Sequence, residues 1–126
     1  MKRLSSKGSH WIWYIFPQLR GLGQSEFATY YGLTGLAEAK EYLEHGILGP
    51  RLKECVEVMN ALQGISAVQV LGDIDAMKFR SCLTLFALAV SKPSVFTQSL
   101  GAYFAGQQCE RTLELLRRQW VPQSEA

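Results

Sequence analysis

The sequence predicts an all-α fold, a single compact domain in which about six or seven short helices surround one buried helix. Across the 126 residues, apolar side chains recur at helical spacing in segments separated by glycine, proline or capping residues. The segment from Leu83 to Val90 is apolar around almost its whole circumference, which is typical of a central helix. The connections are short and the chain shows no linker and no internal repeat, so one domain over residues 1–126 is expected.

The elements are expected in the following order along the chain. Residues 1–8 are expected to be a flexible N-terminus and residues 121–126 a polar tail. Helices are expected at 25–31 capped by Ser25, at 34–46 capped by Thr34, from Pro50 to Gly64, at 67–71 capped by Ser66, from Asp73 or Asp75 to about Ser91, from Pro93 to Gly106, and from Glu110 to Gln119. His45, Gly49 and Pro50 are interpreted as punctuation between two of these helices.

Composition and charge narrow the range of partners. The formal net charge is only +2 and no run of Lys or Arg forms a basic stripe, so no nucleic-acid partner is expected. The longest apolar run is far too short to span a bilayer, and the polar start lacks a signal peptide, so no membrane partner is expected. Two histidines without a Cys or His ligand pattern predict no metal, and no cofactor fingerprint occurs.

The three cysteines indicate a reducing compartment. Cys55, Cys82 and Cys109 are widely spaced and odd in number, which is typical of free thiols in a cytoplasmic protein. Cys55 and Cys82 lie in apolar stripes and are expected to be inert. Cys109 stands in a loop before the last helix and is the only candidate for a reactive thiol.

The stretch from Ser9 to Gly23 is the most unusual in composition. It places Trp11 and Trp13 beside His10, a side chain that can transfer protons near neutral pH, and the tryptophans could stack on a flat ligand. The alternative is that Trp11, Trp13 and Phe16 belong to the core and that His10 is a partly buried, hydrogen-bonded residue. For residues 11–16 both a strand and a helix stay open, because the composition favours a strand whereas the lack of a partner strand favours a helix.

The loop that follows this stretch suits an anion. Arg20 lies on a glycine-rich loop that leads directly to an expected helix N-terminus, where free N–H groups and a guanidinium could bind a phosphate or carboxylate. Gly21 and Gly23 would let the backbone approach the anion closely. The alternative is an ordinary turn with a solvated arginine.

The start of the buried helix carries a second polar group. Asp75, Lys78 and Cys82 share a face with Ser81 beside it, and Thr84 and Arg80 also belong to this segment. Polar residues that lead into an apolar helix are typical of a site at its mouth. The alternative is an Asp–Lys surface pair and a helix cap.

Several motifs, taken together, resemble one family. They are His10-Trp11-Ile12-Trp13-Tyr14-Ile15-Phe16-Pro17-Gln18, Gly21-Leu22-Gly23-x-Ser25, Leu48-Gly49-Pro50-Arg51-Leu52, Asp75-x-x-Lys78-x-x-Ser81-Cys82-x-Thr84-Leu85-Phe86 and Tyr103-Phe104-x-Gly106. The chain is identified by them as a member of the family called domain of unknown function 1810, sometimes labelled calpastatin-like. The resemblance implies a small, mainly helical cytosolic domain without an established activity. Proteins of this family begin with a further helix, and the resemblance implies that this chain lacks it, which would leave an exposed apolar groove at the N-terminus.

Two hypotheses of function follow, and the sequence does not decide whether the protein is an enzyme. The leading one is a site for a small anionic or nucleotide-like molecule. Its ligand-binding residues would be Trp11, Trp13, Gln18, Arg20, Gly21, Gly23, Ser81 and Thr84. The candidate catalytic residues are His10, as a proton donor or acceptor, and Lys78, as a cation that holds negative charge. The competing hypothesis is an interaction module or fragment without chemistry, which forms a homo-oligomer through the N-terminal groove.

Overall fold

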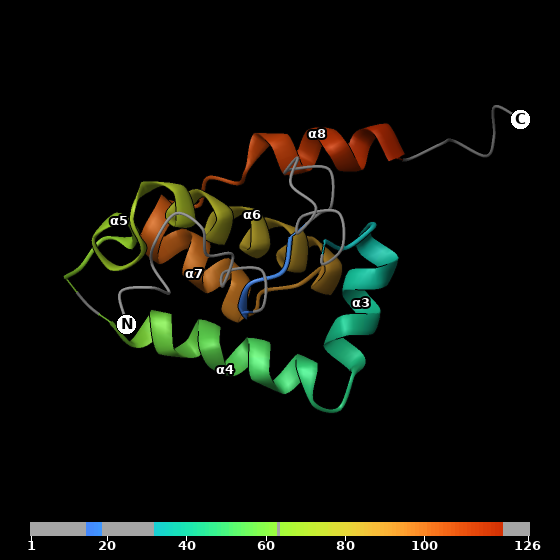
Figure 1. Cartoon of the computed structure of the whole chain (residues 1–126), viewed down its shortest axis with the longest axis horizontal. Coiled ribbons are helices and arrows are strands. Elements are labelled where there is room, and N and C mark those ends of the chain that lie inside the picture. Colours follow the sequence, from blue (N-terminus) through green and yellow to red (C-terminus); the bar gives the residue numbers. More distant parts are fainter. Residues whose placement is uncertain (1–14, 19–31, 63, 120–126) are drawn as a thin grey trace, which may run out of the picture.

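Helix α6 is the element around which the other described helices pack. The computed structural model describes residues 15–18, 32–62 and 64–119. The helices in this part are α3 (Leu36–Glu44), α4 (Leu48–Ala61), α5 (Ala67–Leu71), α6 (Asp73–Val90), α7 (Val95–Phe104) and α8 (Glu110–Gln119). In Figure 1, α6 runs through the middle of the molecule, with α4 below it and α8 above it. The predicted all-helical fold is therefore confirmed.

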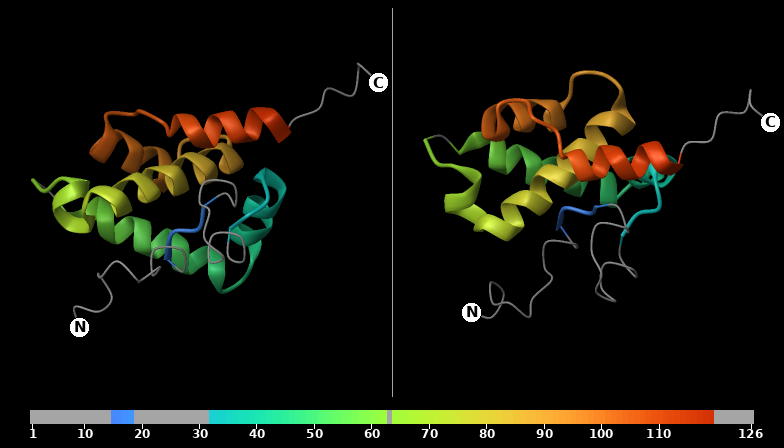
Figure 2. Two further views of the ribbon diagram at one scale, coloured as in Figure 1. Left: turned by 45° about the horizontal axis from the view of Figure 1, so that its top comes forward. Right: turned by 90° about the horizontal axis from the view of Figure 1, so that it is seen from above.

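The burial of α6 follows from its sequence. It packs against α3, α5, α7 and α8, and the turned views in Figure 2 show the same enclosure. Its second half from Leu83 to Ala87 is buried at every position, because an uninterrupted apolar circumference has no face to present to water. The prediction that this helix is central is confirmed.

Aromatic side chains hold the core on both sides of α6. Phe79, Phe86 and Phe96 are fully buried, and the rings of Phe86 and Phe96 stack with centroids 5.5 Å apart. Phe16 packs against Phe79 with a centroid separation of 4.7 Å. Each such aromatic contact contributes about 0.5–1.5 kcal/mol of stability beyond the contribution of the apolar area that it buries. For Phe16, the core role considered in the sequence is confirmed.

The short segment at residues 15–18 is fixed beside the first half of α6. Phe16 inserts into the core, and the backbone carbonyl of Gln18 accepts a hydrogen bond of 2.7 Å from the Leu33 N–H. Pro17 and Gln18 are both buried. The helix or strand expected at 11–16 lies outside the described residues except for residues 15 and 16. The helix expected at 25–31 lies wholly outside them.

The start of α3 differs from the prediction. Gly35, rather than Thr34, is the N-cap of the helix. Thr34 contributes in a different way, since its N–H and its hydroxyl both donate to the Glu38 carboxylate, at 2.7 and 3.0 Å. The prediction of Thr34 as the cap was wrong because the side chain of Glu38 folds back onto it from inside the helix.

One of the two predicted N-caps, that of α5, is found in the structure, and the other, that of α6, is not. Ser66 forms the predicted cap of α5, and it exchanges hydrogen bonds with Gln69 in a capping box. The N-cap of α6 is Gly72, whose φ of 91° favours glycine, so the prediction of Asp73 or Asp75 as the cap was wrong. Both aspartates instead lie in the first turn, where a carboxylate suits the positive end of the helix dipole.

A tight connection joins α3 to α4. The Nδ1 atom of His45 accepts hydrogen bonds of 3.1 Å from the N–H groups of Ile47 and Leu48, and so caps the start of α4. Gly49 is buried in the first turn of α4 against the backbone of Leu43. The interpretation as punctuation between two helices is confirmed for His45, whereas Gly49 and Pro50 lie inside the first turn of α4.

We expect Gly49→Ala to lower the free energy of unfolding by more than about 2 kcal/mol. The new Cβ would collide with the backbone carbonyl of Leu43, which cannot move without displacing the end of α3. Gly46→Ala is the matched control, because no atom lies within 4 Å of its Cβ, and its effect should stay within about 0.5 kcal/mol. Urea unfolding followed by circular dichroism measures both variants, and equal stabilities would contradict the close approach.

Candidate functional site

The predicted site has an N-terminal half, from His10 to Gly23, and a half on α6. Of the predicted site residues, the structure describes only Gln18 in the first half and all of those in the second. Gln18 is buried, with 1% of its surface exposed, and its side-chain amide donates to the Phe16 carbonyl at 3.4 Å. The other predicted residues from the N-terminal half lie outside the described residues: His10, Trp11, Trp13, Arg20, Gly21 and Gly23. The half contributed by α6 is described in full.

Buried hydroxyls on α6 meet the loop before α8. Ser81 and Thr84 are both buried, whereas Lys78 is half-exposed. The Ser81 hydroxyl lies 3.2 Å from the Sγ atom of Cys109, and the Thr84 hydroxyl accepts a hydrogen bond of 2.9 Å from the Cys109 N–H. Two predicted ligand-binding residues are therefore brought together with the thiol that the sequence singled out separately.

Thr84 has partners for both roles of its hydroxyl. It donates to the Arg80 carbonyl one turn earlier at 2.8 Å, and it accepts from Cys109. A buried hydroxyl needs such partners, since leaving one without them costs about 1–3 kcal/mol. The hydroxyl of Thr84 thus joins the central helix to the beginning of α8.

Cys109 caps α8 with its backbone and points its thiol at the same helix end. Its carbonyl accepts the Leu113 N–H at 3.1 Å, so Cys109 directly precedes the first turn. The backbone N–H groups of Arg111 and Thr112 lie near its sulfur and help to lower the pKa of the thiol. These N–H groups have no partner within the helix, and together with the dipole they favour a negative charge on the sulfur.

The three thiols differ in acidity because their surroundings differ. Burial raises the pKa of Cys109, but the hydrogen bonds from the Ser81 hydroxyl and the helix end outweigh it, and the net pKa is lowered. Burial raises the pKa of Cys82 well above its usual value. The pKa of Cys55 is also raised, first by burial and then by the charge of Glu54. The predicted burial is confirmed for Cys82, whereas Cys55 is half-buried.

Thr112 presents a buried hydroxyl to the same sulfur. Its side chain is fully buried, and its Oγ1 atom has no hydrogen-bond partner in the part of the chain that the structure describes. It lies near enough to Cys109 to help lower the pKa of that thiol. The sequence analysis missed Thr112, although its position three residues after Cys109 is the spacing at which a cap and the first helical turn exchange side-chain contacts.

Arg80 is the second group that the sequence analysis left out of the candidate site. Its guanidinium carbon lies 5.5 Å from the ring centroid of Phe104, in the range of a cation–π contact. Its Nε atom is buried and has no hydrogen-bond partner among the described residues. Phe104 is held in place by Phe79, whose ring centroid lies 6.2 Å away. This guanidinium is thus partly desolvated and retains an unused donor.

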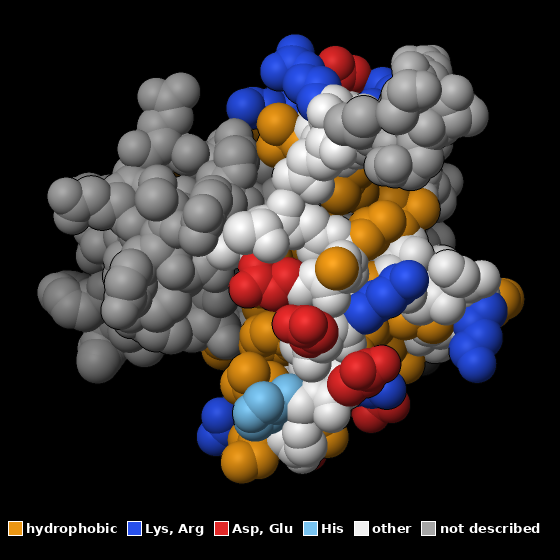
Figure 3. Space-filling view, turned by 90° about the vertical axis from the view of Figure 1, so that its right-hand side faces the viewer, with side chains coloured by type: hydrophobic (Ala, Val, Ile, Leu, Met, Phe, Trp, Pro, Cys, Tyr) orange, Lys and Arg blue, Asp and Glu red, His pale blue; other side chains and the backbone are white. Residues whose placement is uncertain are grey.

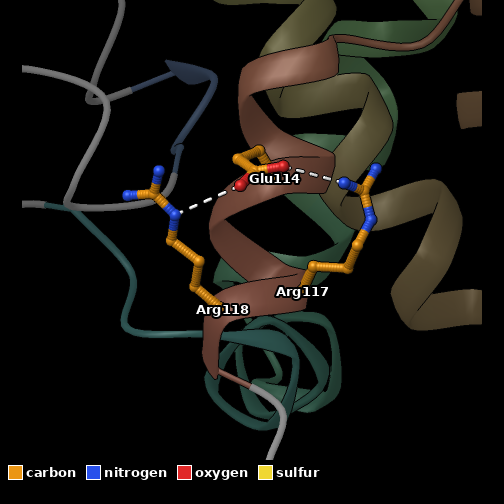
Figure 4. A network of polar contacts seen from close by, with 3 residues as sticks. All are labelled: Glu114, Arg117 and Arg118. Atoms are coloured by element: carbon orange, nitrogen blue, oxygen red, sulfur yellow. Dashed lines mark hydrogen bonds and ion pairs between the residues drawn. The ribbon is translucent and has the colours of Figure 1, made fainter.

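The remaining charged groups of the described surface are dispersed. On the face at the α3 end, acidic, basic and hydrophobic side chains are interspersed (Figure 3). Glu114 pairs with Arg117 at 2.8 Å and with Arg118 at 3.2 Å on the exposed side of α8 (Figure 4). Exposed pairs of this kind stabilise a helix only slightly. The junction of α6 and α8 is therefore distinguished by buried polar groups and not by net charge.

Within residues 15–18, 32–62 and 64–119, no group of three or more His, Cys, Asp or Glu side chains could hold a metal ion. No described helix is both long enough and apolar enough to cross a membrane.

The fold and the junction define a small helical domain built around one buried helix. The chain belongs to the family described as "Protein of unknown function (DUF1810)", which matches residues 2–116. It is similar in structure to the conserved hypothetical protein Rv1873 from Mycobacterium tuberculosis, with a TM-score of 0.83 and 44% sequence identity. The match covers 91% of this chain and 82% of that chain. No curated protein matches the sequence. The resemblance seen in the sequence is confirmed, and these relatives carry no described activity.

We expect Thr84→Val to lower the free energy of unfolding by about 1–3 kcal/mol, because it leaves the Cys109 N–H without its acceptor. Thr84→Ser keeps the hydroxyl and is the matched control, with an expected loss below about 1 kcal/mol. Urea unfolding measures both. An equal loss in the two variants would mean that the Thr84 methyl group, and not its hydroxyl, holds the junction.

Proposed function

We propose that this domain binds a small anionic molecule through Arg80, at the junction of α6 and α8. The observation that carries the proposal is the guanidinium of Arg80, which is held against Phe104 while its buried Nε has no partner among the described residues. A buried donor without an acceptor is costly, so an arrangement that keeps one is best explained by an acceptor that arrives with a ligand.

The chemistry of arginine defines the ligand class. A guanidinium presents its N–H groups in a planar fork that matches the two oxygens of a carboxylate or phosphate. The ring of Phe104 lies 5.5 Å from the guanidinium carbon of Arg80, which leaves the N–H groups that do not contact the ring available to a ligand. The ligand is therefore expected to be a small carboxylate or phosphate, and a neutral molecule would leave the charge of Arg80 uncompensated.

Arg80 has a better position for this role than Lys78. Arg80 and Thr84 are four residues apart and share a face of α6, which is the face that contacts the loop before α8. Lys78 is two residues from Arg80 and so points to a different side of the helix. We retain Lys78 as a candidate only for a ligand that extends around α6. The contribution of His10, Trp11, Trp13 and Arg20 to the same site stays a prediction.

The test is a thermal-shift screen with two arms, one of dicarboxylates and one of sugar phosphates and nucleotides. A binder should raise the apparent stability, by about 2.7 kcal/mol at a concentration one hundred times its dissociation constant. Arg80→Gln should weaken binding about tenfold or more, because a charged hydrogen bond is lost. Arg51→Gln is the control, since it removes the same charge from the exposed face of α4.

Two outcomes would contradict the proposal: no anion stabilises the wild-type protein, or Arg80→Gln and Arg51→Gln weaken binding equally. The screen also tests the N-terminal half of the site. If His10 takes part, His10→Ala should weaken the same ligand in addition to the effect of Arg80→Gln. A shift unchanged by His10→Ala would confine the site to the α6 side.

Self-association is the second candidate function, and exposed apolar side chains favour it. Ile74 and Met77 in the first turns of α6 are 69% and 62% exposed. Val68 and Val70 on the adjacent α5 are exposed as well. Apolar side chains that gather on neighbouring elements are typical of contact surfaces. A second copy of the chain is the occupant to which we commit, because one such patch can bury its equal across a twofold axis.

We expect the protein to form a dimer whose population rises with concentration in sedimentation velocity. Replacing Ile74 and Met77 by lysine should abolish the dimer without unfolding the monomer, because both side chains point into solvent in the single chain. The control is the pair Ile47→Lys and Val58→Lys, which alters exposed apolar residues on another part of the surface. A wild-type protein that stays monomeric at every concentration would exclude this function.

We also propose that the domain works in the cytoplasm. Its three cysteines are all free thiols, and none is paired in a disulfide. Free thiols that include one with a lowered pKa are suited to a compartment that keeps them reduced.

A further inference from the structure

The loop before α8 forms a small polar nest around one sulfur atom. The sulfur of Cys109 lies 3.2 Å from the Ser81 hydroxyl and faces the N–H groups of Arg111 and Thr112. These donors come from two elements, α6 and α8, that are separated by more than a helix length in the sequence. Cys109 is half-buried, so its sulfur stands at the edge of the core and not within it.

The Thr112 hydroxyl is the observation that points beyond the thiol itself. The side chain is 0% exposed, its Oγ1 has no hydrogen-bond partner among the described residues, and it lies beside the sulfur of Cys109. Sulfur is a weak acceptor, so it satisfies a hydroxyl poorly. An oxygen atom attached to that sulfur would be a strong acceptor within reach of the unused hydroxyl.

We propose that Cys109 is a site of oxidation by a hydroperoxide, and that the hydroxyls of Ser81 and Thr112 stabilise the sulfenate that forms. The thiolate attacks one peroxide oxygen, a sulfur–oxygen bond forms and the oxygen–oxygen bond breaks. The sulfur is oxidised by two electrons and the peroxide is reduced. The leaving hydroxide takes the proton of the new sulfenic acid, so that thiolate and hydrogen peroxide give sulfenate and water. The inference does not depend on a ligand at Arg80.

Ser81 has a single proton and two acceptors for it. Its hydroxyl lies 3.1 Å from the Met77 carbonyl and 3.2 Å from Cys109. When the thiol is protonated, the hydroxyl donates to Met77. When the sulfur is ionised, the hydroxyl rotates and donates to the sulfur. The thiolate is therefore stabilised by groups already in place, and its formation needs no histidine as a general base.

Neither of the other cysteines is suited to the same reaction. Cys82 is fully buried, and the pKa of Cys55 is raised by its burial and by Glu54. Both therefore supply little thiolate at neutral pH. Reduction of the sulfenate is assigned to a low-molecular-weight thiol, which forms a mixed disulfide with release of water and is then displaced by a second thiol.

The experiment treats the native 126-residue chain with hydrogen peroxide at pH 7 and traps sulfenate with dimedone. Peptide mass spectrometry then quantifies the adduct at each of the three cysteines, which serve as internal references. We expect the adduct at Cys109 to exceed that at Cys55 by about fivefold or more, with none at Cys82, because only the thiolate reacts. An adduct at Cys55 equal to or greater than that at Cys109 would overturn the proposal.

Two variants separate stabilisation of the thiolate from stabilisation of the sulfenate. Alkylation by iodoacetamide requires the thiolate but adds no oxygen to the sulfur. Ser81→Ala should slow alkylation and peroxide oxidation together, and should move the midpoint of the alkylation rate to higher pH. Thr112→Val should reduce the trapped sulfenate about threefold or more beyond any loss in the alkylation rate, and Thr112→Ser should restore it.

Native near-UV circular dichroism is required of each variant before its chemistry is compared. If Thr112→Val changes oxidation and alkylation by the same factor, Thr112 acts only on the thiolate, and its assigned role with the sulfenate is wrong. Arg51→Gln, on the exposed face of α4, should leave the oxidation of Cys109 within about twofold of wild type. A wild-type protein that forms the Cys109 sulfenate but is stabilised by no anion would mean that the ligand site fails while the oxidation site stands.

Discussion

The burial of α6 on all sides from Ser81 to Ala87 is the constraint on which the rest of the structure depends. A helix without a solvent-facing side must satisfy every polar side chain that it carries from within the protein. Ser81 and Thr84 meet this requirement by donating to the carbonyls of Met77 and Arg80 one turn earlier. Their oxygens remain free to contact the next element, and that element is the loop that starts α8.

The same constraint explains why the candidate site lies at this junction. The Cys109 N–H precedes the first turn of α8 and needs an acceptor, which Thr84 supplies from the central helix. Once this bond fixes the loop, the thiol of Cys109 has to lie beside Ser81 and the free N–H groups of the helix end. Core packing and the position of the thiol are thus consequences of the same two hydroxyls.

The sequence predicts what depends on local pattern and misses what depends on long-range contacts. The capping box of Ser66, the last helix from Glu110 to Gln119 and the central helix follow from signals within a few residues. The N-cap at Gly72 was missed because an aspartate beside it carries the stronger statistical signal, while the backbone conformation decides. The contact between Ser81 and Cys109 joins residues 28 apart in the sequence, and no local pattern of residues predicts it.

The two groups that the sequence analysis left out of the site share one physical property. The Nε of Arg80 and the hydroxyl of Thr112 are buried polar atoms without a normal hydrogen-bond partner in the described structure. Each costs about 1–3 kcal/mol if nothing compensates, a large share of the stability of a small domain. Arg80 adjoins Ser81 on α6, and Thr112 lies in the first turn of α8, so both costs arise at one junction. Unsatisfied groups that result from poor packing would have no reason to coincide in this way. Their occurrence on the two helices that meet at this junction is expected if the junction is kept for a ligand oxygen or an oxidised sulfur to complete.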